Sequence, residues 1–353
     1  MRRLPVYFLV DVSESMVGEP IQQVQDGMRT IIQELRTDPY ALETVYVSII
    51  AFAGKAKQIS PLTELFKFYP PTFPIGSGTS IGVGLNFLMD SIDREVVKTT
   101  LESKGDWKPI IFLFTDGTPT DDYTMAFDRW NKHYRKHCNI IPISIGDNAD
   151  LSILKQISDN VLQLKDTDEN AFKAFFKWVT ASIRTTSMSV TDTGVDEVKL
   201  APIDGIHLEE VLLDPMASTI DENFAIVSAR CQETKKLYLI KYAKRGRVSK
   251  ELEPYRDLPE IKDEFKLVGA YPVVEKDYDD LSGSLITHRI ISTDSLYGRP
   301  TCPCCGNQYG MVICECGSIF CVGDSGKTKC PWCGMEGELT LGDGSTNIIR
   351  ERG

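Results

Sequence analysis

Two short apolar runs, each followed by an aspartate, limit the fold of this chain more than any other feature. The first run ends at Asp11 in VYFLVDVSESM, and the second ends just before Asp116 in IIFLFTDGTPTDD. Apolar runs of this length without polar alternation are typical of parallel strands that are buried on both faces. Ligand sites on such sheets lie at the carboxyl ends of the strands, so the two aspartates are expected to meet there, although about a hundred residues separate them.

The sequence around these runs predicts alternating strands and helices over residues 1–188. Between the strand-like runs, apolar residues recur at helical spacing. The piece from residue 56 to 65 is predicted to be an antiparallel edge strand, because Pro61 would interrupt the ladder of an interior strand. We therefore predict an α/β domain with a doubly wound, mostly parallel sheet and helices on both faces.

The rest of the chain has a different pattern. Residues 189–300 show weak helical periodicity and a hairpin-like stretch over 223–244, so they are predicted to be a β-rich connector or part of the C-terminal domain. Within them, the basic run that begins at Lys241 is expected to be a solvated turn, and Asp277–Asp280 an exposed loop. Residues 301–353 form a cysteine-rich segment, which is predicted to be a zinc-ribbon-like module.

Five oxygen-bearing side chains in the first domain could bind one cation. They are Asp11, Ser13, Ser15, Thr79 and Asp116. Two carboxylates and three hydroxyls form a hard ligand set that suits Mg²⁺, Mn²⁺ or Ca²⁺ better than zinc. The alternative is that the hydroxyl side chains only cap helices and the aspartate a turn, as such residues often do.

The cysteines point to a second kind of metal site. Ten are present, and eight of them lie between Cys302 and Cys333, which in a reducing compartment favours metal binding over disulfides. Two C-x-x-C-G knuckles predict one structural Cys₄ zinc site made by Cys302, Cys305, Cys330 and Cys333.

Four further thiols in this segment leave several interpretations open. Cys304, Cys314, Cys316 and Cys321 could form a second zinc site, remain spare thiols or pair differently with the knuckles, and an iron–sulfur cluster is a further alternative. Cys138 and Cys231 lie far from the segment and are predicted to be small core residues.

The net charge of −11 argues against sequence-independent nucleic-acid binding and against a membrane-surface role. No apolar run is long enough for a transmembrane helix. The apolar stretch near the N-terminus is short and has no small-residue cleavage site, so it is interpreted as a strand rather than a signal peptide. These observations lead us to expect a cytoplasmic protein.

The oxygen-bearing residues also carry a family resemblance. Asp-Val-Ser-Glu-Ser at 11–15, Gly78-Thr79 and Thr115-Asp116-Gly117 resemble the metal-ion-dependent adhesion site of von Willebrand factor A domains, over about residues 4–187. The resemblance implies that all five residues are metal ligands, with the hydroxyls in more direct contact and one or both aspartates acting partly through water.

The cysteine segment extends this resemblance. An A domain followed by CPCCG, CECG and CPWCG is similar to the TerY type of protein, which is associated with tellurium resistance and stress response. The resemblance implies a non-enzymatic adaptor whose partners are a protein kinase and a PP2C-type phosphatase. Three other functions remain open: an accessory subunit of an AAA-type ATPase, a metal-dependent hydrolase and a thiol redox protein.

Overall fold

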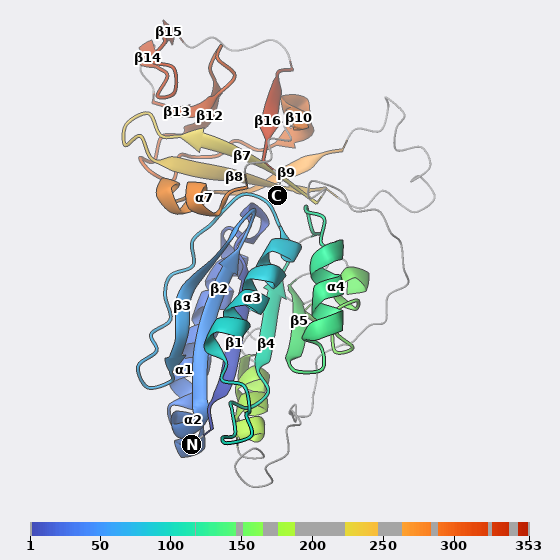
Figure 1. The fold of residues 1–353 in the computed structure, drawn as a ribbon. Coiled ribbons are helices and arrows are strands. Elements are labelled where there is room, and N and C mark those ends of the chain that lie inside the picture. The colour runs from blue at the N-terminus through green and yellow to red at the C-terminus, as the bar shows by residue number, and fades with distance from the viewer. Residues whose placement is uncertain are drawn as a thin grey trace.

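The computed structural model describes residues 2–116, 118–145, 151–164, 176–187, 223–245, 263–283, 289–323, 327–338 and 345–351. They form an N-terminal α/β domain and a C-terminal β-rich domain, which lies across one end of the first (Figure 1). Among these residues, no helix is long and apolar enough to cross a membrane.

A six-stranded sheet in the order β3-β2-β1-β4-β5-β6 forms the centre of the described N-terminal domain. Its strands are β1 (Leu4–Asp11), β2 (Val45–Phe52), β3 (Ala56–Glu64), β4 (Ile110–Thr115), β5 (Asn139–Ile145) and β6 (Leu162–Leu164). Neighbouring strands are parallel except β3, which pairs antiparallel with β2 at the edge. The predicted fold class and the antiparallel edge strand containing Pro61 are therefore confirmed.

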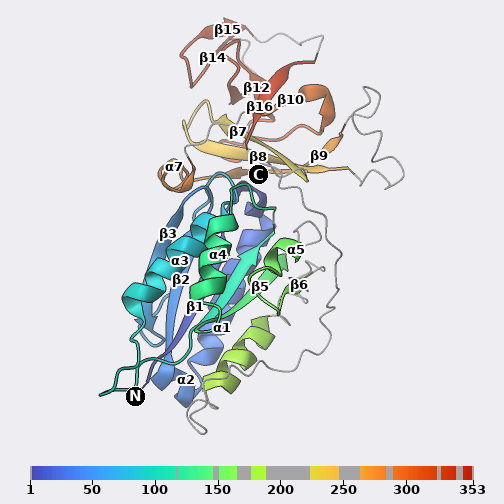
Figure 2. The same cartoon turned by 45° about the vertical axis from the view of Figure 1, so that its right-hand side comes forward.

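Helices cover both faces of this sheet. They are α1 (Glu19–Leu35), α2 (Pro39–Thr44), α3 (Ile81–Glu95), α4 (Thr124–His133), the short α5 (Leu151–Leu154), a helix described over 176–187, and a 3-10 turn, η1 (Glu14–Met16). Side chains alternate along β1: Phe8 packs toward α1 and the 176–187 helix, whereas Tyr7 and Leu9 pack toward α3 and α4. Figure 2 shows α3 and α4 together on one face.

A second six-stranded sheet, in the order β11-β9-β8-β7-β13-β12, organises the described part of the C-terminal domain. Its strands are β7 (Phe224–Arg230), β8 (Leu237–Lys244), β9 (Phe265–Pro272), β11 (Leu296–Tyr297), β12 (Tyr309–Ile313) and β13 (Ile319–Val322). The expected hairpin is the β7–β8 pair. Because β7 also pairs with β13, one sheet includes strands from both 189–300 and 301–353.

Smaller elements surround this sheet. They are the pair β10 (Arg289–Ser292) and β16 (Asn347–Arg350), the pair β14 (Lys327–Lys329) and β15 (Glu336–Glu338), the helix α7 (Glu275–Leu281), and the 3-10 turn η3 (Thr293–Ser295). The expectation of an exposed loop at Asp277–Asp280 is wrong, because these residues lie in α7. Tyr278 and Leu281 are three residues apart on this helix, and both are buried.

The C-terminal domain covers the carboxyl end of the N-terminal sheet. In both Figure 1 and Figure 2, β8, β9 and α7 lie beyond the end at which β1 and β2 finish. Leu281 of α7 packs into the core of the N-terminal domain, and its carbonyl accepts a hydrogen bond of 2.8 Å from the amide of Lys55. The two domains therefore meet at the end of the sheet where the candidate cation site lies.

Candidate metal centres

The two aspartates of the oxygen set lie at the ends of adjacent parallel strands. Val10 of β1 pairs with Phe114 of β4, so Asp11 ends its strand beside Thr115. The Thr115 hydroxyl donates to Asp11 Oδ2 over 2.6 Å. Asp116 follows Thr115 directly, so the sheet brings the two carboxylates to the same end, as the sequence indicated.

The two serines join this pair through the turn after β1. The Ser13 amide donates to Asp11 Oδ1 over 2.9 Å, which folds the chain back over the strand end. The hydroxyls of Ser13 and Ser15 are 2.9 Å apart, and the Ser15 hydroxyl donates to Asp116 Oδ1 over 2.8 Å. Four of the five proposed ligands therefore form one hydrogen-bonded group.

Thr79 comes from the loop before α3. Gly78 precedes it with φ of 84°, a conformation that favours glycine. The Thr79 amide donates to Thr120 Oγ1 over 2.9 Å, which holds this loop against the segment after Asp116. The Thr79 Oγ1 atom itself is buried without a hydrogen-bond partner among the described residues. Leaving a buried hydroxyl unpaired costs about 1–3 kcal/mol, and a bound cation would satisfy its oxygen.

All five side chains are nearly inaccessible, with exposed fractions between 0% and 5%. Buried carboxylates are normally paired or bound to metal, because an uncompensated charge is expensive to remove from water. A set of two carboxylates and three hydroxyls fits Mg²⁺ or Mn²⁺, both of which prefer oxygen ligands. The donor chemistry fits a hard cation, as does the Thr79 oxygen, for which the described ranges offer no hydrogen-bond partner.

Two residues that sequence reasoning missed lie against this site. Glu14, between the two serines, accepts hydrogen bonds from the Gly78 amide (3.1 Å) and the Tyr278 hydroxyl (2.5 Å). Burial, with a smaller contribution from the charge of Glu351, raises the pKa of Glu14 to about 8. Its variable position in the D-x-S-x-S pattern gave no sign of this role.

Lys241 is the second missed residue. Its ammonium donates to the carbonyl of Ser15 and, over 3.4 Å, to that of Val17. Lys241 is only 3% exposed, so a solvated turn is the wrong description of this residue. A signal was present: Lys241 follows Leu237 and Leu239 at the spacing of two that places residues on one face of a strand.

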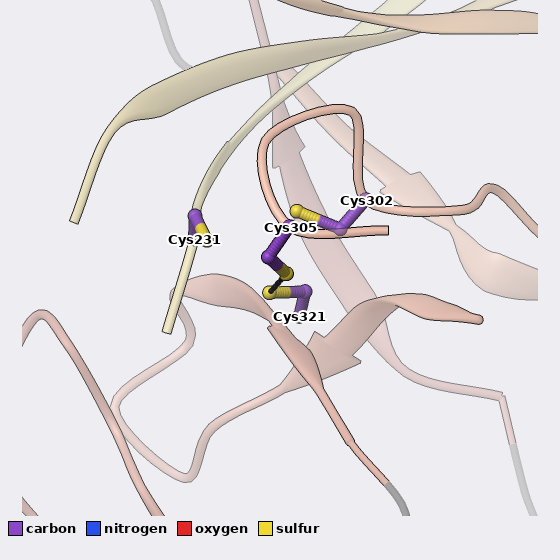
Figure 3. A group of neighbouring side chains, drawn as sticks. All are labelled: Cys231, Cys302, Cys305 and Cys321. Carbon is purple, nitrogen blue, oxygen red and sulfur yellow. Dashed lines mark hydrogen bonds between the residues drawn. The ribbon is translucent and has the colours of Figure 1, made fainter. Parts of the chain in front are cut away.

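The described cysteines form two groups of four, in each of which the Sγ atoms all lie within 4.8 Å of one another. The first group is Cys231, Cys302, Cys305 and Cys321 (Figure 3), and the second is Cys314, Cys316, Cys330 and Cys333. Sulfur–sulfur distances of 3.6, 3.7 and 4.0 Å occur within them. Tetrahedral zinc with bonds of about 2.3 Å would place its sulfurs about 3.8 Å apart, so both groups fit zinc.

This grouping differs from the predicted one. The two knuckles do not share a site: Cys302 and Cys305 belong to the first group, and Cys330 and Cys333 to the second. The first knuckle is completed by Cys321 on β13 and by Cys231, which β7 brings close because it pairs with β13. Cys231 is a buried core residue, as predicted, but it also belongs to a group of thiols that could hold a metal.

The same arrangement determines where the remaining thiols lie. Cys314 and Cys316 lie in the connection between β12 and β13 and complete the second group. Cys304 belongs to neither group of described cysteines. The sequence around Cys231 gives no sign that it is a ligand, because the nearest cysteine, Cys302, is about 70 residues away.

Local hydrogen bonds favour the thiolate form of one ligand in each group. The hydroxyl and amide of Ser318 lower the pKa of Cys316 to about 6. Burial acts to raise the pKa of Cys231, but hydrogen bonds from Thr234, Cys305 and the Glu233 amide together outweigh it and lower this pKa to about 7. Thiolates are the metal-binding form of cysteine, so both environments suit a metal ligand.

Several known proteins are similar to part of this chain. Over 158 residues the chain is 22% identical to the bovine inter-alpha-trypsin inhibitor heavy chain H1, an alignment that covers 43% of this chain and 17% of that protein. Among solved structures it resembles proximal thread matrix protein 1 from the mussel byssus, with 18% identity and a TM-score of 0.39 over 52% of this chain and 48% of that one. It also resembles the pilus adhesin SpaC from Lactobacillus rhamnosus GG, with 13% identity and a TM-score of 0.43 over 52% and 31%.

The chain thus spans less than half the length of each of these relatives. Two family models match it in separate regions: the von Willebrand factor type A domain matches residues 6–177, and the TerY-C metal binding domain matches residues 221–353. Together they confirm the resemblance inferred from the motifs. The chain therefore contains a von Willebrand factor type A domain followed by a TerY-C metal binding domain.

Proposed function

We propose that this protein is a non-enzymatic adaptor that binds a carboxylate of a protein partner through a cation, Mg²⁺ or Mn²⁺, in its A domain. The observation that carries the proposal is the convergence of oxygen donors at one sheet end, including a buried Thr79 hydroxyl that has no hydrogen-bond partner within the described part of the chain. Mg²⁺ takes six oxygen ligands, so five protein donors leave one position for an outside oxygen.

The C-terminal domain has a structural part in this proposal. Each thiol group supplies four sulfurs and therefore leaves zinc no open position for catalysis. We propose that two Zn²⁺ ions hold this domain together. By resemblance to the TerY type of protein, we further propose that its partners are a protein kinase and a PP2C-type phosphatase of a stress-response or tellurium-resistance system.

Direct binding of Mn²⁺ to the full-length chain, measured by calorimetry, tests the cation site. Thr79→Ala removes one oxygen and should weaken binding at least about tenfold, while Thr79→Ser keeps the oxygen and should restore it. Circular dichroism checks that all three proteins are folded. Equal Mn²⁺ affinity in the three would contradict the assigned ligand set.

Affinity capture from lysate tests the adaptor role. Wild type and Asp11→Ala are compared with and without Mg²⁺, and captured proteins are identified by mass spectrometry. A kinase or phosphatase that is captured only by wild type with Mg²⁺ would support the proposal. A ring ATPase would instead favour the accessory-subunit function, and identical captures in all conditions would contradict metal-dependent recognition.

A further inference from the structure

The face of the A domain that a partner would approach is covered by the chain's own C-terminal domain. An outside carboxylate must reach the cation from beyond the carboxyl ends of β1 and β4. That space is where β8 and α7 lie (Figure 1), and the five ligand side chains are at most 5% exposed.

Two buried polar contacts fix this cover onto the metal-binding loop itself. Lys241 on β8 donates to the carbonyls of Ser15 and Val17, and Tyr278 on α7 donates to the carboxyl group of Glu14. These acceptors lie between and just after the two serine ligands. The C-terminal domain therefore contacts the loop that would hold the cation, not merely a distant part of the A domain.

Two backbone amides of the A domain depend on the cover for their hydrogen bonds. The Lys55 amide donates to the Leu281 carbonyl over 2.8 Å, and the Ser77 amide donates to Ser282 Oγ over 3.0 Å. The neighbouring Gly76 amide instead donates to Val12, inside the A domain, over 2.9 Å. Opening of the interface should expose the Lys55 and Ser77 amides but not that of Gly76, whereas unfolding of the A domain should expose all three.

An apolar seal accompanies the polar contacts. Ile75, in the loop that carries Thr79, packs against a small cluster formed by β7, β8 and α7, which includes Ile226, Leu239 and Tyr278. Leu281, three residues after Tyr278 on α7, packs into the core of the A domain and is 1% exposed. Buried apolar side chains therefore accompany the Glu14–Tyr278 contact at the interface.

We propose that the C-terminal domain is the resident occupant of the ligand-binding face, and that a partner carboxylate reaches the cation only after this internal interface opens. The inference rests on the proposed function for its consequence, because the carboxylate position matters only if a cation is bound. The interface itself is independent of that function and can be tested without any metal.

Hydrogen exchange of single amides in the full-length chain, followed by NMR, tests the interface. In wild type, the Lys55 and Ser77 amides should be protected. In the double variant Lys241→Met/Tyr278→Phe they should exchange at least about tenfold faster, while the Gly76 amide changes little. The milder Ser282→Ala removes the acceptor of the Ser77 amide, together with a local hydrogen bond from Ser282 to the Tyr278 carbonyl, and leaves the acceptor of the Lys55 amide in place. It should therefore expose the Ser77 amide and not that of Lys55.

The exchange measurement can support or overturn the proposed interface. Unprotected Lys55 and Ser77 amides in wild type would overturn the proposal. So would unchanged protection in a double variant that calorimetry shows to be folded, since the named contacts would then not hold the cover in place.

Solvent access to the cation is measured with Mn²⁺ as the probe. Water-proton relaxation per bound Mn²⁺ should be higher in the double variant than in wild type, because opening lets bulk water exchange at the free position. Equal relaxation would overturn the access claim. If neither protein bound Mn²⁺, the result would contradict the cation site on which the proposed function rests. The amide exchange would still show whether the interface between the two domains is closed.

Discussion

A β-carbon added to Gly54 would lie 2.2 Å from the amide nitrogen of Gly283, so the two domains meet backbone to backbone at this point. Gly54→Ala therefore forces two backbone segments apart, because no flexible side chain can move aside. We expect a loss of about 1–3 kcal/mol in unfolding free energy, measured by urea denaturation. Gly337→Ala, where a β-carbon meets nothing within 4 Å, is the matched control and should change stability by less than about 0.5 kcal/mol. Equal losses in the two variants would contradict the close contact.

The hydroxyl of Tyr278 is predicted to stabilise the folded chain through Glu14. Tyr278→Phe leaves the buried Glu14 carboxyl group without one of its donors, which should cost about 1–3 kcal/mol. Tyr297 also donates to a carboxylate, that of Glu264 over 3.2 Å, but is 43% exposed. Tyr297→Phe should therefore change the unfolding free energy by less than about 0.5 kcal/mol. If both substitutions had the same small effect, the Glu14 contact would not be a significant one.

Zinc content separates the observed thiol grouping from the predicted one. The purified chain should contain two zinc ions, and Cys231→Ser should retain only one, because it removes a ligand of the first group. Cys304→Ser should keep both, since Cys304 lies in neither described group. Metal analysis of the three proteins gives the ratios. Full retention of zinc by Cys231→Ser would exclude Cys231 as a ligand.

Asp121 is expected to make stability depend on pH. Burial raises its pKa to about 6, although hydrogen bonds from amides that include that of Val83 act against the rise. The folded state therefore holds a proton that the unfolded state has already lost, so this residue reduces stability as the pH rises from about 4 to 6. Asp121→Asn should remove that loss and be more stable at pH 7 by about 1–2 kcal/mol, measured by denaturation across pH 4–8 without added Mg²⁺. A constant difference between the two proteins over that range would contradict the shifted pKa.

Much of the A domain could be predicted from sequence because its determinants are local. Apolar runs without alternation marked β1 and β4 as buried parallel strands, and Pro61 marked β3 as an edge. Ligand sites on parallel sheets lie at the carboxyl ends of the strands. This rule placed Asp11 and Asp116 together without any structural information.

The C-terminal domain could not be predicted to the same depth, because its key contacts are not local. Spacing identified two knuckles but cannot say whether they share one metal or take partners from elsewhere. That depends on the pairing of β7 with β13, which brings Cys231 to Cys321. Lys241 and Tyr278 were assigned to solvent because their partners, Ser15 and Glu14, lie in the other domain.

The two thiol groups also differ in the length of chain that each one closes. A metal bound to the first group would join Cys231 to Cys302 and close a loop of about 70 residues, whereas Cys316 and Cys330 in the second span about 14. Loop-closure entropy grows with the logarithm of loop length, so the first cross-link restricts the unfolded chain by about 1.4 kcal/mol more. Of the two, it is the one that links the start of the C-terminal domain to its cysteine-rich segment.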